Sequence, residues 1–226
     1  MTLQKNDFIE IEFTGRLKEG EVFDSNIKSE LAKLNAKAEA KPFVFSLGHD
    51  MFLKGIEEYL IGKTGSDFEI SLTPEKAFGK REPSLIQRMP ANIFREQKVT
   101  PYPGAVFNFD GKMGKVLAVS GGRVMLDFNS PLAGKDVVYT IKILRKVTDK
   151  KEQADAFMDF LFKKKFNFNI SEKKVVVEVE KQMAKFVELF KDKFKEILDL
   201  ELEVKEIEDK KKEDKKQDKK EVKNAA

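Results

Sequence analysis

Residues 11–26 read IEFTGRLKEGEVFDSN, and this stretch determines how the fold begins. At its start, apolar residues alternate with glutamates: Ile9, Ile11 and Phe13. A period of two is the pattern of a half-buried β-strand. Gly20 then precedes the apolar pair at 22–23. Because glycine adopts positive φ without steric cost, this break predicts a hairpin turn into a second strand.

Downstream, the apolar period switches between helix and strand. Residues 27–38 place apolar side chains at spacings of four, three and four, which predicts a short surface helix with Ser25 and Asn26 as candidate caps. The same reasoning predicts the other elements of this part: strands over 43–47, 68–72 and 137–144, and a helix over 53–61 that stops near Gly62.

The sequence between the predicted strands 68–72 and 137–144 has a different pattern. After a loop rich in proline come three short strand-like runs, over residues 105–109, 116–120 and 123–128. The turn sequences Asp110-Gly111 and Gly121-Gly122 join them. These runs predict a small all-β insert.

Beyond residue 148 the pattern becomes αβαβ. A helical face from 154 to 161 precedes a strand over 175–180, a wide amphipathic stripe over 183–198 and an alternating run over 200–204. We expect a second domain here, whose stripe packs on its own strands or forms a homodimer surface. Residues 209–226 are mostly charged and cannot build a core.

The amino-acid composition excludes several kinds of reactive and metal-binding site. The 226 residues include no cysteine and one histidine, so disulfides, thiolate metal sites and cysteine nucleophiles are excluded, and we expect no metal and no cofactor. His49 precedes a predicted helix and is more often a loop or cap residue than a catalytic one. A net charge of +4 spread over mixed signs does not indicate nucleic-acid binding. No apolar run is long enough to span a membrane, and the chain reads as cytoplasmic.

Four runs, in order, carry a family resemblance: IEFTGRLKEGEVFDSN (11–26), KPFVFSLGHDMFLKGIEE (41–58), SLTPEKAFG (71–79) and LAGKDVVYTIKIL (132–144). They resemble the FKBP-type peptidyl-prolyl isomerases. The insert is similar to the insert-in-flap domain of SlyD-like members, and the C-terminal extension is similar to the long archaeal type. The resemblance implies an α+β fold: an FKBP-like twisted antiparallel sheet around a short helix, with a small all-β insert and an αβαβ C-terminal domain.

The same resemblance implies domain boundaries. The isomerase domain would comprise residues 1–86 and 131–147, with the insert at 87–130. The C-terminal domain would span 148–208 and the charged tail 209–226.

The resemblance also implies a pocket for the substrate proline. The residues expected to act in catalysis are Phe13, Asp24, Phe78 and Tyr139. Those expected to bind substrate are Phe23, Phe43, Phe52, Leu53 and Ile56. Ile56 stands where short members have tryptophan, Phe78 where many have tyrosine, and Ser130 where SlyD-like members often have histidine. The His-rich tail of SlyD is absent, so nickel handling is not carried over.

Such a pocket needs no acid, base or nucleophile, because rotation about a prolyl bond breaks no covalent bond. We therefore expect a peptidyl-prolyl isomerase and folding chaperone whose partners are unfolded chains with X-Pro bonds, with no membrane or nucleic-acid partner. The alternative is a catalytically weak FKBP-like scaffold that binds a partner through its C-terminal domain. A ribosome- or RNA-associated protein is disfavoured, because lysines and acids are mixed along the tail.

The insert offers two interpretations. Its apolar residues either form a surface that holds unfolded clients or make up the core of a domain of some 45 residues, and both roles can coexist. The residues in question are Leu85, Ile93, Phe94, Phe107 and Met113.

Overall fold

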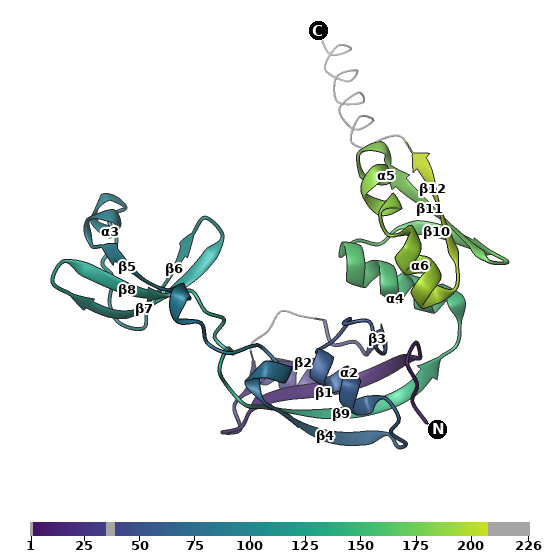
Figure 1. Cartoon of the computed structure of the whole chain (residues 1–226), viewed down its shortest axis with the longest axis horizontal. Helices are drawn as coiled ribbons and strands as arrows, with labels where there is room; N and C mark the ends of the chain where they lie inside the picture. The colour runs from purple at the N-terminus through teal and green to yellow at the C-terminus, as the bar shows by residue number, and fades with distance from the viewer. Residues whose placement is uncertain (1, 35–38, 208–226) are drawn as a thin grey trace, which may run out of the picture.

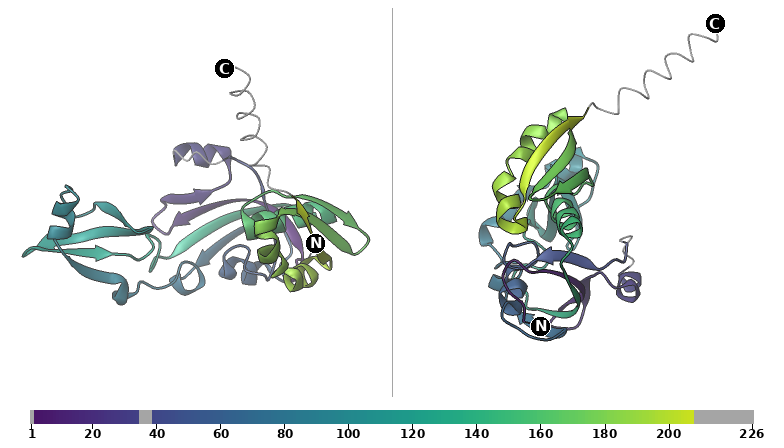
Figure 2. Two further views of the ribbon diagram at one scale, coloured as in Figure 1. Left: turned by 90° about the horizontal axis from the view of Figure 1, so that it is seen from above. Right: turned by 90° about the vertical axis from the view of Figure 1, so that its right-hand side faces the viewer.

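The computed structural model describes residues 2–34 and 39–207. They form a central five-stranded sheet, with an insert sheet and a C-terminal sheet at opposite ends of the molecule (Figures 1 and 2). Among the described helices, none is both long enough and apolar enough to cross a membrane. The tail predicted over 209–226 and Ala38 of the predicted first helix lie outside the described residues.

The central sheet confirms the predicted antiparallel FKBP-like fold. Its strands follow the order β2-β1-β9-β4, with β3 also paired to β1. They comprise β1 (Phe8–Leu17), β2 (Val22–Ser25), β3 (Phe43–Ser46), β4 (Asp67–Leu72) and β9 (Val137–Val147). The helix α2 (Lys54–Leu60) buries Ile56 and Leu60 in the same core cluster as these strands. The 3-10 turns η1 (Pro74–Lys76) and η2 (Pro83–Leu85) follow β4.

The first helix is shorter than predicted and is capped differently. It is α1 (Lys28–Lys33), and its N-cap is Ile27, which makes no side-chain cap bond. Ser25 and Asn26 bond mainly to β1 instead: the Ser25 hydroxyl donates to the carbonyl of Phe13, and the Asn26 side chain accepts from the Phe13 N–H at 2.7 Å. The prediction of these two residues as helix caps was wrong, because the neighbouring strand offers them buried backbone partners.

The insert is a separate antiparallel sheet with its own core. Its order is β5-β8-β7-β6, and the helix α3 (Asn92–Glu96), which the sequence pattern did not predict, covers it. The strands are β5 (Ile86–Pro90), β6 (Val106–Phe109), β7 (Lys112–Ser120) and β8 (Arg123–Asp127). The core cluster of the insert is distinct from that of the rest of the chain.

The C-terminal part adds a strand to the predicted pattern. Helix α4 (Lys150–Phe162) leads to β10 (Asn167–Ser171), which pairs antiparallel with β11 (Lys174–Glu180). Strand β12 (Glu201–Ile207) pairs parallel with β11. Helix α4 lies against β3, and one core cluster runs through both the central and the C-terminal sheets.

The predicted stripe over 183–198 is two helices, not one. Helix α5 (Lys181–Glu188) ends at Leu189, and α6 (Lys191–Leu198) follows. The break falls at Leu189 and Phe190, and the two helices together form the crossover between the parallel strands β11 and β12.

Candidate active site

One row of residues across the central sheet organises the site. In β1, Gly15 pairs with Asp24 of β2 on one side and with Tyr139 of β9 on the other. A Cβ atom added to Gly15 would lie 2.9 Å from ring carbons of both Phe23 and Tyr139. Glycine therefore leaves the space that these two rings occupy.

Aromatic rings from five separate segments meet around Tyr139. Its ring centroid lies 5.7 Å from that of Phe52, 5.8 Å from that of Phe23 and 6.1 Å from that of Phe13. The ring centroid of Phe78 lies 5.6 Å from that of Phe23, and the ring centroid of Phe43 lies 5.6 Å from that of Phe52. We call this set the aromatic cup: Phe13, Phe23, Phe43, Phe52, Phe78 and Tyr139. The structure thus brings together all six aromatic residues predicted for the pocket.

The predicted pocket residues differ in how far they reach the surface. Tyr139 is 1% exposed and Ile56 is 0% exposed, and both belong to the core cluster against which the more exposed rings pack. Ile56 therefore lies below the surface that a ligand would touch in this conformation, and its predicted place at the pocket floor is an indirect one. The partly exposed members are Phe23, Phe43, Phe52, Leu53 and Phe78.

Asp24 provides a carboxylate next to the cup. The Asp24 side chain is exposed, but its neighbours partly desolvate the carboxylate and raise the pKa of Asp24 above its usual value, against the opposing effect of the Ser25 backbone N–H. Burial also raises the pKa of the Tyr139 hydroxyl, and the negative charge of Asp24 adds to this shift. The two groups therefore interact electrostatically, and Tyr139 stays protonated at neutral pH.

Sequence reasoning missed the support of the loop that carries Phe52. Glu57 of α2 is 2% exposed, and its carboxylate accepts four backbone N–H bonds from that loop. The donors are Gly48 at 2.7 Å, His49 at 2.9 Å, Asp50 at 3.2 Å and Phe52 at 2.7 Å. Burial raises the pKa of Glu57, although these bonds oppose the rise. The only signal in the sequence was a glutamate on the apolar face of a predicted helix.

Phe45 is a second residue that the site prediction left out. It is fully buried, stacks on Phe43 with a centroid distance of 5.3 Å, and lies 5.5 Å from Phe52. It backs the cup from within β3, the strand that contacts α4. Its place in the alternating run over 43–47 pointed to a core position, but not to which ring it supports.

Two further residues have structural roles. The His49 ring bonds to the Asn6 side chain at 2.8 Å, and burial lowers its pKa. This agrees with the interpretation of His49 as a loop residue. The Ser130 hydroxyl accepts from the Leu132 N–H at 3.3 Å in the turn that leads from the insert back to β9.

The apolar residues predicted as a client-holding surface of the insert are divided by the structure. Phe94 is 2% exposed and forms the insert core, so its expected exposure was wrong: a small sheet needs a large ring to fill its interior. Ile93 and Phe107 pack partly buried against that core, and Leu85 is also partly buried. Met113 is 57% exposed.

Comparison with known sequences identifies the family. A sequence model described as "FKBP-type peptidyl-prolyl cis-trans isomerase" matches residues 1–101. A relative in Methanocaldococcus jannaschii, the short-type peptidyl-prolyl cis-trans isomerase, is 32% identical over 146 residues, which is 62% of this chain and 92% of that protein. The chain belongs to the FKBP-type peptidyl-prolyl isomerases. It is accordingly a peptidyl-prolyl cis-trans isomerase.

Other matches place this FKBP-type isomerase more closely. The model described as "FKBP26, IF domain" matches residues 87–132, which confirms the insert-in-flap resemblance. The FKBP-type 16 kDa isomerase of Escherichia coli is 32% identical over 149 residues, or 63% of this chain and 93% of that protein. SlyD of Vibrio cholerae is 27% identical over 152 residues, or 64% of this chain and 68% of that protein. Neither family model reaches beyond residue 132.

Proposed function

We propose that the aromatic cup is where this isomerase turns the prolyl bond. The observation that carries the proposal is the ring cluster around Tyr139, seated opposite Gly15 with Asp24 beside it. Phe13 and Tyr139 supply a rigid apolar base, and Phe23, Phe52 and Phe78 supply the rings that a proline side chain reaches. Phe43, Leu53 and Ile56 complete the lining and its support.

Differential binding of the twisted amide accounts for catalysis at such a site. The planar X-Pro amide is held by resonance behind a barrier of about 18–20 kcal/mol, and it is more polar than the twisted form. A cup that excludes water favours the less polar, twisted amide over the planar one. Asp24 would act at the rim by orienting the substrate backbone or a neighbouring ring.

Isomerisation of a short X-Pro peptide at low temperature tests this assignment, because the uncatalysed reaction then takes minutes. We expect the intact protein to accelerate it, and Phe78→Ala to lose most of that acceleration. Phe186→Ala is the matched control, since Phe186 is 49% exposed in α5, outside the cup. Equal activity in both variants would place the reaction outside the cup.

We further propose that the insert, residues 87–130, holds unfolded client chains beside the isomerase domain formed by residues 1–86 and 131–147. The exposed Met113 and Val106, at 57% and 53%, support this role, because an adaptable apolar surface suits varied sequences. Deleting residues 88–128 should slow refolding of a protein client much more than turnover of a short peptide. Equal losses would leave the insert a purely structural role.

The domain of residues 148–208 is proposed as a homodimer surface. Phe186 and Leu189, 49% and 77% exposed, adjoin a cluster of Phe162, Phe166 and Phe190 rings. Light scattering of the full chain should give the mass of a dimer, and Leu189→Asp should restore the monomer. A monomeric intact chain contradicts the proposal. We also propose that the protein acts in the cytoplasm, as the sequence predicts.

A further inference from the structure

The insert sheet turns its aromatic residues to one side only. Alternation along the strands sends Phe107, Phe109, Val116, Val124 and Leu126 to the face that α3 covers, where they form or pack against the insert core. We call the opposite face of the sheet the outer face. Residues that pair across the strands point to the same face, and the following pairs point to the outer one: Val106 with Lys115, Asn108 with Met113, Ala118 with Met125, Ser120 with Arg123, and Arg88 with Met125.

The outer face has a strong excess of positive charge. Lys115 and Arg123 lie on its central strands and Arg88 on the edge strand β5, and all three are exposed. Arg81 and Lys135 join them at the base, where the insert meets the central domain. Counted over the four strands of the insert alone, four cations, Arg88, Lys112, Lys115 and Arg123, stand against one carboxylate, that of Asp127.

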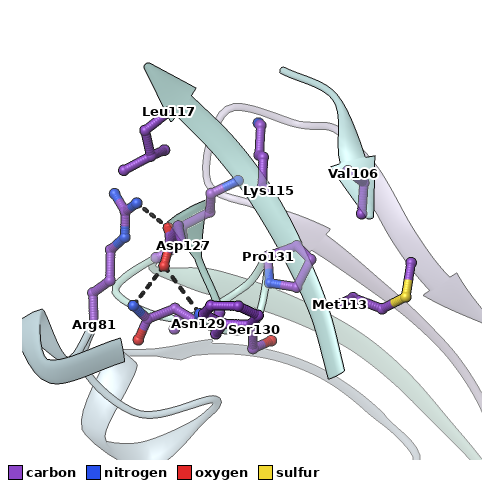
Figure 3. A pocket seen from close by; sticks show the side chains of 12 residues that line it. Arg81, Val106, Met113, Lys115, Leu117, Asp127, Asn129, Ser130 and Pro131 are labelled. Atoms are coloured by element: carbon purple, nitrogen blue, oxygen red, sulfur yellow. Dashed lines mark hydrogen bonds and ion pairs between the residues drawn. The ribbon is translucent and has the colours of Figure 1, made fainter. Parts of the chain in front are cut away.

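That single carboxylate is already occupied (Figure 3). Asp127 is 8% exposed, and it is ion-paired with Arg81 and accepts both the N–H of Asn129, at 3.0 Å, and the Asn129 side-chain amide, at 2.7 Å. Lys115 lies across the strand from it without forming an ion pair. Within the described residues, Arg88, Lys115, Arg123 and Lys135 have no ion-pair partner.

Apolar side chains lie among these cations and line a groove. Figure 3 shows Val106, Met113, Leu117 and Pro131 around the same space as Lys115. The groove has a volume of about 490 Å³, and Lys135 also lines it. A second hollow, of about 220 Å³, continues on this face between Arg88, Arg123 and Met125. The outer face therefore combines flexible apolar contacts with unpaired positive charge.

From this combination we infer that the outer face selects unfolded polypeptide segments in which apolar residues are flanked by aspartate or glutamate. Carboxylates of the segment would meet Lys115, Lys135, Arg88 and Arg123, while its apolar side chains enter the groove lined by Val106 and Met113. The inference rests on the proposed client-holding role of the insert and adds a preference for charge. Complementary charge chiefly sets specificity and the rate of encounter.

A polypeptide fits this face better than a nucleic acid. Single-stranded nucleic acids bind through aromatic side chains on which bases stack. In the insert, Phe94, Phe107 and Phe109 pack in or against the core, and Phe128, which packs against the same core, is the one aromatic residue that lines the groove among the described residues. Tyr102 is 64% exposed but lies outside the strands that form the outer face. The outer face offers methionine and valine between its cations instead, which suit aliphatic side chains.

Binding of three labelled peptides to the full-length protein tests the inference. The peptides share one apolar core without proline, so that the aromatic cup does not bind them, and their flanks are acidic, neutral or basic. Fluorescence anisotropy should show the acidic peptide binding about tenfold more tightly than the basic one. The double variant Lys115→Gln with Lys135→Gln should reduce that difference to about twofold, while binding of the neutral peptide stays the same.

Lys112→Gln is the matched control. Lys112 lies in the same strand, three residues from Lys115, but it pairs with Phe109 on the opposite face, and it should keep the full preference.

Equal binding of all three peptides by the intact protein would overturn charge selection and leave the holding role in place. No binding of any peptide would overturn both. Tighter binding of a single-stranded oligonucleotide than of the acidic peptide would overturn the inference in favour of a nucleic acid. Prolyl isomerase activity of the same samples reports separately on the cup.

Discussion

The aromatic cup and the outer face of the insert use apolar side chains in opposite ways. In the cup, Tyr139 is 1% exposed and Phe13 is 7% exposed, and the rings hold each other in place. On the outer face, Met113 and Val106 are more than half exposed and lie among unpaired cations. A rigid cup suits one small shape, the proline ring, whereas an open face with flexible side chains suits many sequences.

The two regions also differ in what supports them. The cup lies in a core cluster that continues into the C-terminal domain, and Glu57 ties down its loop. The insert has its own small core around Phe94. The two functions are therefore expected to be separable by single substitutions, and the following experiments test that separation.

The largest effect should come from Glu57→Ala. It would leave backbone N–H groups of the loop at 48–52 without a partner next to a buried site, which should lower the free energy of unfolding by about 3 kcal/mol or more. Isomerase activity should fall with it, because Phe52 belongs to this loop. Urea unfolding followed by a peptide isomerisation assay measures both.

Glu58→Ala is the matched control for Glu57. Glu58 is the next residue but is exposed, and it makes one ion pair with Lys76 at 3.9 Å. Its substitution should change the unfolding free energy by about 0.5 kcal/mol or less. Similar losses in the two variants would show that the backbone bonds to Glu57 do not hold the cup.

Substitutions at two comparable glycines, one in the cup and one in the insert, should separate the two regions, with smaller expected effects than Glu57→Ala. Neither Gly15 nor Gly114 has positive φ, and a Cβ on either would lie 2.9 Å from a ring carbon: of Phe23 and Tyr139 at Gly15, and of Phe128 at Gly114. Gly15→Ala should lower kcat/KM for a short peptide by tenfold to a hundredfold, because misplaced site groups lose that much. It should leave binding of the proline-free acidic peptide unchanged.

Gly114→Ala should show the reverse pattern. Overpacking the insert core costs about 1–3 kcal/mol and should weaken peptide binding by the insert, with short-peptide turnover intact. The pair is measured with the same two assays. If either glycine variant impaired both activities equally, the cup and the insert would behave as one unit.

The smallest expected effect concerns Asp24. Asp24→Asn should lower kcat/KM about threefold to tenfold without unfolding the protein, because it removes the charge beside the cup but keeps the shape. Partial desolvation raises the pKa of Asp24, an exposed side chain of β2, so the folded protein holds this proton more tightly than the unfolded chain does, and ionisation opposes folding as pH rises through that pKa. The variant should therefore melt slightly higher than the parent at pH 7, and the difference should shrink towards pH 4.

Thermal melts at the two pH values, together with isomerisation rates, measure this. Other groups that titrate in this range are common to both proteins and cancel in the difference. A difference in melting temperature that is the same at pH 4 and pH 7 would show that the Asp24 carboxylate is not desolvated. An unchanged kcat/KM would remove it from catalysis.

Much of this architecture was readable from local pattern. The alternation around Phe13, the stop near Gly62 and the turns at Asp110-Gly111 and Gly121-Gly122 correspond to observed strands, a helix end and hairpins. Errors arose where a local pattern had a stronger partner elsewhere. Ser25 and Asn26 bond to β1 instead of capping α1, and the stripe over 183–198 forms two helices between the parallel strands β11 and β12.

The sequence by itself determined the alternating strands and carried the motifs that resemble the FKBP family, and that resemblance in turn implied the six rings of the cup. The strands and the motifs depend on residue type and short spacing, which the chain displays directly. Only the tertiary structure decided that Gly15 lies between Asp24 and Tyr139, that Glu57 holds the loop of Phe52, and that Arg88, Lys115 and Arg123 share one face of the insert while Phe107 and Phe109 share the other. These relations join residues distant in sequence through strand register and loop packing, and no local pattern encodes them.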